Sequence, residues 1–171
     1  MTAEKRQNAA RGSSRLNGMT GFRVHPLHPA LLAHVRATDV DTSGNLVEHL
    51  TGITGPLRCC LRSAREDEKV ILFGYEPVLP GVSPYREIGA VYAHAEQCDG
   101  PAGEGYPEQW LDRPQVLRAY DKRGWIHPTT RVHDGTDPVR EIEEILADPD
   151  VVEIHSRNIA YGCYMFSITR A

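Results

Sequence analysis

The sequence contains no apolar run near the roughly 20 residues that a membrane-spanning helix needs, and no apolar stretch near its N-terminus resembles a secretory signal. An excess of basic residues is also missing, because 19 lysines and arginines stand against 23 acids and give a net charge of −4 at pH 7. Binding to a nucleic-acid backbone requires a basic face, so nucleic-acid partners are not expected. These absences favour a cytoplasmic protein whose partners are neither membranes nor nucleic acids.

Cysteine is scarce too, and the sequence has no motif that is diagnostic of a particular reaction. The chain has four cysteines, which are too few for the disulfide framework of a small secreted domain: Cys59, Cys60, Cys98 and Cys163. In a reducing cytosol we expect these side chains to be thiols or metal ligands. The sequence has no pair of CxxC motifs, no Gly-rich phosphate loop and no βαβ rhythm, so no single motif names the function.

The composition fits one globular domain preceded by a polar segment. A chain of 171 residues with 40% hydrophobic and 25% charged residues is long enough to bury a core of its own. Residues 1–20 hold four basic residues, one acid and almost no aliphatic side chain, so they cannot bury enough surface to offset the entropy lost on ordering. We therefore predict a disordered basic tail over 1–20 and a single α+β domain over 21–171. A docking arm for an acidic partner is the alternative for the tail.

Helical periodicity is clearest near the C-terminal third of the chain. A helix is predicted from Pro138 to Ala147, with Asp137 as its N-cap, proline in its first turn and an apolar stripe of Val139, Ile142, Ile145 and Leu146. Short helices are predicted over Pro29–Arg36 and within Thr38–Pro56.

Alternating and β-branched residues predict the strands: Gly21–Leu27, Val70–Tyr75, Gly89–His94, Val116–Tyr120 and a return segment, Trp125–Val132, broken by Pro128. Sequential hairpins favour antiparallel pairing. The predicted fold is therefore α+β, a mainly antiparallel sheet of five to seven strands with the Pro138 to Ala147 helix packed on one face.

The stretch Val151–Arg170 reads as a closing hairpin. We predict that Ile154 faces Tyr164 and that His155 faces Cys163, with Glu153 on the same face as His155. Directly opposed residues have Cβ atoms about 4.5–5.5 Å apart, so an imidazole would reach the thiol. This arrangement suits a cysteine nucleophile with a histidine base; the alternative is a buried, inert cysteine.

Five blocks of the sequence resemble a known family when taken together and in order: PLRCCLR (56–62), SPYR (83–86), GAVYAHAEQC (89–98), LRAYD (117–121) and IHSRNIAYGCY (154–164). Over roughly residues 21–171 the chain resembles the bacterial family catalogued as domain of unknown function 1203 (DUF1203). The positions that match its pattern are Cys60, Pro84, Tyr85, Gly89, His94, Cys98, Arg118, Tyr120, Asp121, Asn158, Gly162 and Cys163.

The chain departs from the family pattern at Leu57, where cysteine is usual, and at Ala90, where proline is usual. The missing cysteine weakens any four-ligand metal site built on the first block. The resemblance implies no activity, since the family is defined as one of unknown function.

Cys60, His94 and Cys98 form a candidate metal site, because nitrogen and sulfur ligands with an i, i+4 spacing suit Zn²⁺. Unrelated buried thiols, or a Cys60–Cys98 disulfide in oxidised protein, are the alternatives.

A second candidate is a pocket for an anionic small molecule. Tyr85, Arg86 and Arg118 are its predicted substrate-binding residues, together with Asn158 from the closing block and with His94 nearby. Arginine offers a planar fork to carboxylate or phosphate. The alternative for Arg118 is an ion pair with an acid across the sheet.

These candidates support three hypotheses. The leading one is a small-molecule enzyme or ligand-binding protein of bacterial metabolism, with acid/base chemistry at His94 and His155 and a nucleophile at Cys163. The others are a non-catalytic binding or regulatory module and a zinc-stabilised domain. A small-molecule ligand is the expected partner and a homodimer stays open; no cofactor is expected in the leading hypothesis, and zinc is the one left open.

Overall fold

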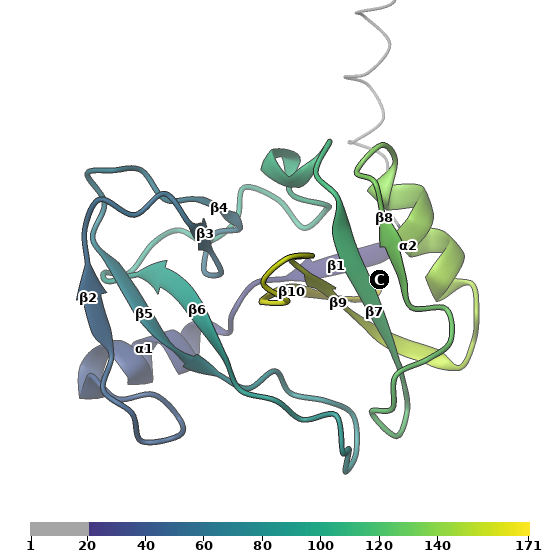
Figure 1. The fold of residues 1–171 in the computed structure, drawn as a ribbon, viewed down its shortest axis with the longest axis horizontal. Helices are drawn as coiled ribbons and strands as arrows, with labels where there is room; N and C mark the ends of the chain where they lie inside the picture. Colours follow the sequence, from purple (N-terminus) through teal and green to yellow (C-terminus); the bar gives the residue numbers. More distant parts are fainter. Residues whose placement is uncertain (1–20) are drawn as a thin grey trace, which may run out of the picture.

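The computed structural model describes residues 21–171, which form two α-helices and two five-stranded, mostly antiparallel sheets (Figure 1). The predicted α+β class is confirmed. The predicted tail over 1–20 lies outside the described residues. Neither α-helix of the described chain has the length and apolar character that crossing a membrane would require.

Sheet 1 holds the two ends of the described chain side by side. Its strand order is β1-β10-β9-β7-β8, and every neighbouring pair is antiparallel. The strands are β1 (Phe22–His25), β7 (Gln115–Asp121), β8 (Arg131–His133), β9 (Val151–Arg157) and β10 (Tyr164–Arg170). Because β1 pairs with β10, the first and last strands of the described chain lie next to each other in the sheet.

Sheet 2 is built from the residues between β1 and β7. Its strand order is β2-β5-β6-β3-β4, with one parallel contact, between β3 and β6. The strands are β2 (Glu48–Leu50), β3 (Pro56–Leu57), β4 (Arg62–Ser63), β5 (Val70–Tyr75) and β6 (Gly89–His94). Helix α1 (Pro29–Thr38) precedes this sheet and buries Leu32 and Val35 in its core. A 3₁₀ turn, η1 (Glu108–Trp110), follows it.

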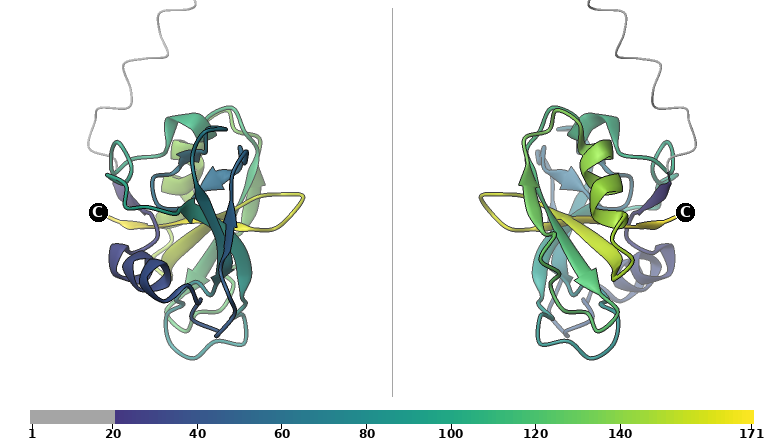
Figure 2. Two further views of the ribbon diagram at one scale, coloured as in Figure 1. Left: turned by 90° about the vertical axis from the view of Figure 1, so that its left-hand side faces the viewer. Right: turned by 90° about the vertical axis from the view of Figure 1, so that its right-hand side faces the viewer.

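Helix α2 (Pro138–Leu146) confirms the helix predicted from Pro138 to Ala147. The Asp137 side chain accepts a hydrogen bond from the Arg140 backbone N–H, which caps the first turn. Ile142 and Ile145 are fully buried in the core of sheet 1. The helix lies across the face of sheet 1 that points away from sheet 2 (Figure 2). The opposite face of sheet 1 is therefore left to meet sheet 2.

The two sheets meet at the turn that joins β3 to β4. Arg58 is buried in this turn, and its Nε donates a hydrogen bond of 2.8 Å to the backbone oxygen of Tyr164 on β10. Its Nη1 donates to the backbone oxygen of Pro56. Leu61, from the same turn, packs into the core of sheet 1. The turn thus connects sheet 2 to sheet 1.

The prediction of a single sheet of five to seven strands is wrong, because the strands divide between two sheets. The short helix predicted within Thr38–Pro56 is also wrong; that segment forms a bridge between Val40 and Leu46 and then β2. The buried carboxylate of Asp41 accepts hydrogen bonds from backbone N–H groups of its own loop and from Gly74 on β5. These bonds hold the loop against sheet 2 in a non-helical shape.

The return segment predicted over Trp125–Val132 does pair with β7, but only through the short edge strand β8 and a bridge between Tyr120 and Ile126. Pro128 lies between the two contacts. Since proline has no N–H to donate to a strand neighbour, the interruption follows from the sequence.

The register predicted for the closing hairpin is wrong. Strand β9 pairs with β10 so that His155 lies opposite Ser167 and Ile154 lies opposite Ile168. The pairing shifts between Tyr164 and Phe166, and the extra residue, Met165, is buried beside Phe166 in the core of sheet 1. A bulge of this kind moves every later side chain by one position relative to a regular ladder.

Cys163 lies in the loop before β10 and not opposite His155, because β9 continues to Arg157, which pairs with Tyr164. Its sulfur contacts the backbone oxygen of Tyr161 at 3.8 Å. The loop is closed by a hydrogen bond of 3.0 Å from the Asn158 N–H to the Cys163 oxygen. The predicted face-to-face pairing of base and nucleophile is therefore absent from this hairpin.

Candidate metal centre

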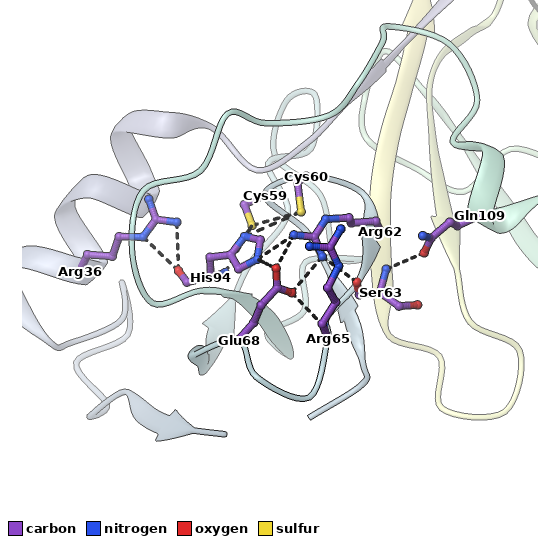
Figure 3. A network of polar contacts seen from close by, with 9 residues as sticks. All are labelled: Arg36, Cys59, Cys60, Arg62, Ser63, Arg65, Glu68, His94 and Gln109. Atoms are coloured by element: carbon purple, nitrogen blue, oxygen red, sulfur yellow. Dashed lines mark hydrogen bonds and ion pairs between the residues drawn. The ribbon is translucent and has the colours of Figure 1, made fainter. Parts of the chain in front are cut away.

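Three cysteines and one histidine converge at one end of sheet 2. Cys59 and Cys60 lie in the turn between β3 and β4, His94 is the last residue of β6, and Cys98 follows in the next loop. Their sulfur and imidazole nitrogen atoms all lie within 4.8 Å of one another. Figure 3 shows the His94 ring with the sulfurs of Cys59 and Cys60 on one side.

The parallel contact between β3 and β6 brings these residues together. Leu57 lies opposite Tyr92, and the Arg58 N–H donates a hydrogen bond of 2.8 Å to the Tyr92 oxygen. The chain then turns sharply, with the Leu61 N–H donating to the Leu57 oxygen at 3.0 Å. Leu61 has a φ of 55°, in the left-handed region that costs an L-residue about 1–2 kcal/mol. The tight turn directs two consecutive cysteines toward the end of β6.

The distances among Cys59, Cys60 and His94 match the edges of a zinc-centred tetrahedron. Zn²⁺ bonded to sulfur at about 2.3 Å and to imidazole nitrogen at about 2.0 Å holds two sulfurs about 3.8 Å apart and a sulfur and a nitrogen about 3.5 Å apart. The sulfurs of Cys59 and Cys60 are 3.9 Å apart. The Nδ1 atom of His94 lies 3.5 Å from the first and 3.8 Å from the second. One metal ion fits these atoms with little movement.

The far side of the His94 ring is held by a carboxylate. Its Nε2 atom lies 3.3 Å from Oε1 of Glu68. With the proton on Nε2, the ring donates to Glu68 and its Nδ1 lone pair points at the sulfurs, which is the tautomer that binds a metal through Nδ1. Nη2 of Arg62 lies 3.2 Å from the same Nε2 and donates to it only in the other tautomer.

Glu68 is itself fixed on both oxygens. Arg62 donates to them in a fork, at 2.9 Å and 2.6 Å, and the Arg65 backbone N–H donates at 2.8 Å. These donors, Arg62 first, hold the pKa of the Glu68 carboxyl well below its usual range. Glu68 is thus a charged, immobile acceptor for the imidazole N–H (Figure 3).

The backbone of His94 is anchored as well. Its N–H donates to the Cys59 sulfur at 3.3 Å, a contact that favours a thiolate. Its carbonyl oxygen accepts from Nε and Nη2 of Arg36, on α1, at 3.1 Å and 3.0 Å. The histidine is therefore positioned through both its ring and its main chain.

The thiols differ in how readily they lose their protons. A hydrogen bond from Cys59 to Cys60 raises the pKa of Cys59, and burial adds to that effect. The same bond lowers the pKa of Cys60, and the nearby Arg62 charge acts in the same direction. Burial raises the pKa of Cys98. Because metals bind thiolates, a bound cation would take the place of the thiol protons.

A cavity of about 600 Å³ adjoins the cluster. Cys59 and Cys98 line one side of it, and residues of α1, including Leu32 and Arg36, line another. The sulfur cluster therefore borders this cavity through Cys59 and Cys98.

The family comparison can now be set beside this geometry. The family model described as "Protein of unknown function (DUF1203)" matches residues 54–170, which include all four cluster residues. The chain belongs to the DUF1203 family. No curated protein and no solved structure matches it. The resemblance predicted from the sequence blocks is confirmed over residues 54–170, and it carries no activity with it.

Three members of the cluster, Cys60, His94 and Cys98, were predicted from the DUF1203 pattern and the ligand spacing. Cys59 was missed. The pattern places a cysteine at position 57, but Leu57 is buried in the core of sheet 2 and pairs with β6. The consecutive cysteines at 59 and 60 were the available signal, and a turn tight enough to direct both inward was not foreseeable from spacing alone.

The predicted anion pocket is not assembled as one group. Arg86 pairs with Glu76, and the Tyr85 ring packs edge-on against Trp125 at a centroid distance of 6.1 Å. His94 lies at the opposite end of β6 from both. Arg118, in β7, donates to Glu87 at 2.8 Å; this acid lies in the loop before β6 and not across the sheet, where His155 is opposite Arg118. Asn158 lies in the loop before β10.

His155 is buried in the middle of sheet 1, 1% exposed, with its ring between Tyr120 and Tyr164. Its Nε2 atom lies 3.2 Å from Oε1 of Glu153, so the predicted carboxylate neighbour is present. Burial lowers the pKa of His155, and the Glu153 carboxylate opposes that effect only in part. The catalytic roles predicted for His155 and Cys163 stay predictions.

Proposed function

We propose that this member of the DUF1203 family is a zinc-stabilised domain in which Cys59, Cys60, His94 and Cys98 bind one Zn²⁺. The observation that carries the proposal is that two sulfurs and one imidazole nitrogen lie at tetrahedral edge distances, with the Cys98 sulfur within 4.8 Å of all three. A carboxylate on the second ring nitrogen, here Glu68, is the usual partner of a zinc-binding histidine. Soft sulfur and nitrogen donors select zinc over magnesium or calcium.

The proposed role of the ion is structural. Four protein ligands close the coordination sphere, whereas catalytic zinc sites keep one position for water or substrate. The ion would connect the β3–β4 turn, the end of β6 and the loop that follows. It would also fix Arg58, which neighbours Cys59 and contacts β10. Zinc binding at such a site contributes directly to the free energy of folding.

The other two hypotheses receive less support from the geometry. General acid/base chemistry at His94 needs a free ring nitrogen, but one faces the thiols and the other faces Glu68. A Cys163 nucleophile needs a base within reach, and His155 lies opposite Ser167 instead. A binding or regulatory module remains compatible with a structural zinc ion, since the two roles do not compete.

Metal analysis of the purified protein tests the proposal. Protein prepared under reducing conditions without chelator is expected to hold one zinc per chain. Cys60→Ser is expected to lose most of that zinc. Cys163→Ser is the matched control, because this cysteine lies outside the cluster and should leave the zinc content unchanged.

Substitution by Co²⁺ gives a second, spectroscopic readout. A tetrahedral site with three thiolates is expected to show strong d–d bands and sulfur-to-metal charge transfer, lost in Cys60→Ser and kept in Cys163→Ser. A parent protein that neither contains zinc nor takes it up on refolding would overturn the proposal. Stoichiometric iron in place of zinc would overturn the assignment of the metal.

A further inference from the structure

A second polar cluster lies on the face of sheet 1 that meets sheet 2. Two arginines, Arg118 on β7 and Arg157 on β9, both contact one oxygen of Glu87, from the loop that precedes β6. Nη1 of Arg118 donates to Oε1 of Glu87 at 2.8 Å, and Nη2 of Arg157 pairs with the same oxygen. A single carboxylate oxygen therefore serves two guanidinium groups.

The strand register explains why the arginines converge. Arg118 lies directly opposite His155 across the β7–β9 pair, and Arg157 follows two residues later on the same face. Side chains two apart on a strand point to the same side of the sheet. The nearby acid on that face, Glu153, is already bound to His155. Glu87 is thus the carboxylate that both arginines contact.

The arginines are more buried than the acid that they hold. The side chain of Arg157 is 6% exposed and that of Arg118 is 26% exposed, whereas Glu87 is 46% exposed. Glu87 therefore lies at the outer end of the cluster. A ligand approaching from solvent would meet the carboxylate first and the two guanidinium groups behind it.

Hydrogen-bonding capacity in the cluster is left unused. The buried Nε of Arg157 and the buried Nδ1 of His155 have no hydrogen-bond partner among residues 21–171. A guanidinium normally binds a carboxylate or phosphate through two parallel N–H groups, but Glu87 offers both arginines the same Oε1 atom. The cluster thus has more donors than Glu87 satisfies.

We propose that Arg118 and Arg157 form a binding site for a small molecule bearing a carboxylate or phosphate group, and that Glu87 occupies this site as an internal substitute that the ligand displaces. A planar or tetrahedral anion with several oxygens would engage the Arg118 fork together with Nη2 and Nε of Arg157, whose Nη1 already donates to the Gly162 oxygen. The site is separate from the zinc centre, since its arginines and His155 belong to sheet 1.

Binding of simple anions to the full chain tests the site, with inorganic phosphate and acetate as probes in calorimetry and thermal unfolding. Glu87→Gln removes the negative charge that competes for the two arginines and should bind the preferred probe at least tenfold more tightly than the parent. The same probe should raise its unfolding temperature more. Glu76→Gln is the matched control, because this acid pairs with Arg86 in the same loop and should behave like the parent.

Arg118 provides the second arm of the test. Adding Arg118→Gln to Glu87→Gln should remove the gained affinity. If that double variant folds poorly, Arg118→Lys takes the place of Arg118→Gln, because lysine keeps the charge but lacks the fork, and it should also reduce the gained affinity. Preference for phosphate or for acetate identifies the group that is bound. A folded Glu87→Gln protein that binds neither probe with a dissociation constant below about 10 mM would overturn the proposal.

Discussion

The Nε2 atom of His94 lies 3.3 Å from a carboxylate oxygen of Glu68, on the side of the ring opposite the cysteine sulfurs. Glu68 comes from the loop between β4 and β5, so its contact with the end of β6 is set by the fold of sheet 2. The pair determines which ring nitrogen faces the thiols, and it therefore decides whether the four side chains can act as one metal site.

Replacing Glu68 by glutamine should weaken zinc binding by about 10–100-fold, because the amide cannot accept the imidazole proton as strongly as the carboxylate does. Competition with a chelator of known affinity measures the change. Glu66→Gln, an exposed acid two residues earlier in the same loop, should leave the affinity unaltered. Equal affinities for the Glu68 and Glu66 variants would show that Glu68 does not orient the histidine.

Zinc should stabilise the folded protein in proportion to its free concentration. A ligand that binds only the folded state adds about 2.7 kcal/mol at a hundred times its dissociation constant. Urea unfolding of metal-stripped protein, with and without added zinc, measures this difference. The gain should vanish in Cys98→Ser and persist in Cys163→Ser. Identical unfolding curves with and without zinc in the parent would contradict a structural role.

Arg58 should contribute strongly to stability by joining the two sheets. Burial lowers its pKa to about 10, which still leaves it charged at neutral pH, and its side chain satisfies the backbone oxygens of Tyr164 and Pro56. Arg58→Met leaves these acceptors without their donor and should reduce the free energy of unfolding by about 1–3 kcal/mol. Arg23→Met, which removes an exposed ion pair, should cost much less. Comparable losses would argue against this link.

Stability should fall as the solution becomes mildly acidic, in part because of His155. Burial lowers the pKa of His155, so the unfolded chain takes up a proton that the folded chain resists. The loss begins as the pH falls below the ordinary histidine value of about 6.5 and continues down to the lowered pKa of the folded state. One such group contributes up to about 1.4 kcal/mol per pH unit.

The groups that face His155 are Glu153, Tyr120, Tyr164, Arg118 and Arg157. His155→Gln removes the titration while these neighbours remain, so its stability should depend less steeply on pH than that of the parent between about pH 7 and about pH 5. His133, whose pKa is also lowered by burial, keeps its own contribution in both proteins. Parallel pH profiles from urea unfolding would contradict the assignment to His155.

The parts of the fold that local sequence determines were predictable. The Asp137-Pro138 start and the apolar spacing specified α2, and the β-branched content of Val70–Tyr75 specified β5 to the residue. The division into two sheets was not, because it depends on contacts such as β1 with β10 that join distant parts of the chain. The hairpin register failed for a different reason: the turn lies farther along the chain than the alternation indicated, so that Tyr164 pairs with Arg157, and the bulge at Met165 adds one more residue to the offset.

The candidate metal centre was likewise predictable only where local sequence determines it. Cys60, His94 and Cys98 were predicted because their spacing and chemistry suit zinc. Cys59 and Glu68 could be assigned to the site only from the three-dimensional structure. The left-handed turn at Leu61 directs Cys59 toward His94, and Glu68 lies in a loop 26 residues before His94 in the sequence. Short-range patterns identify ligands more readily than they identify the residues that orient them.

X-ray absorption at the zinc K-edge of the purified parent protein tests the central claim most directly, because it reports the atoms bonded to the metal. The geometry predicts a four-coordinate shell of three sulfurs at about 2.3 Å and one imidazole nitrogen at about 2.0–2.1 Å. A shell made only of oxygen and nitrogen atoms would contradict a site at Cys59, Cys60, His94 and Cys98.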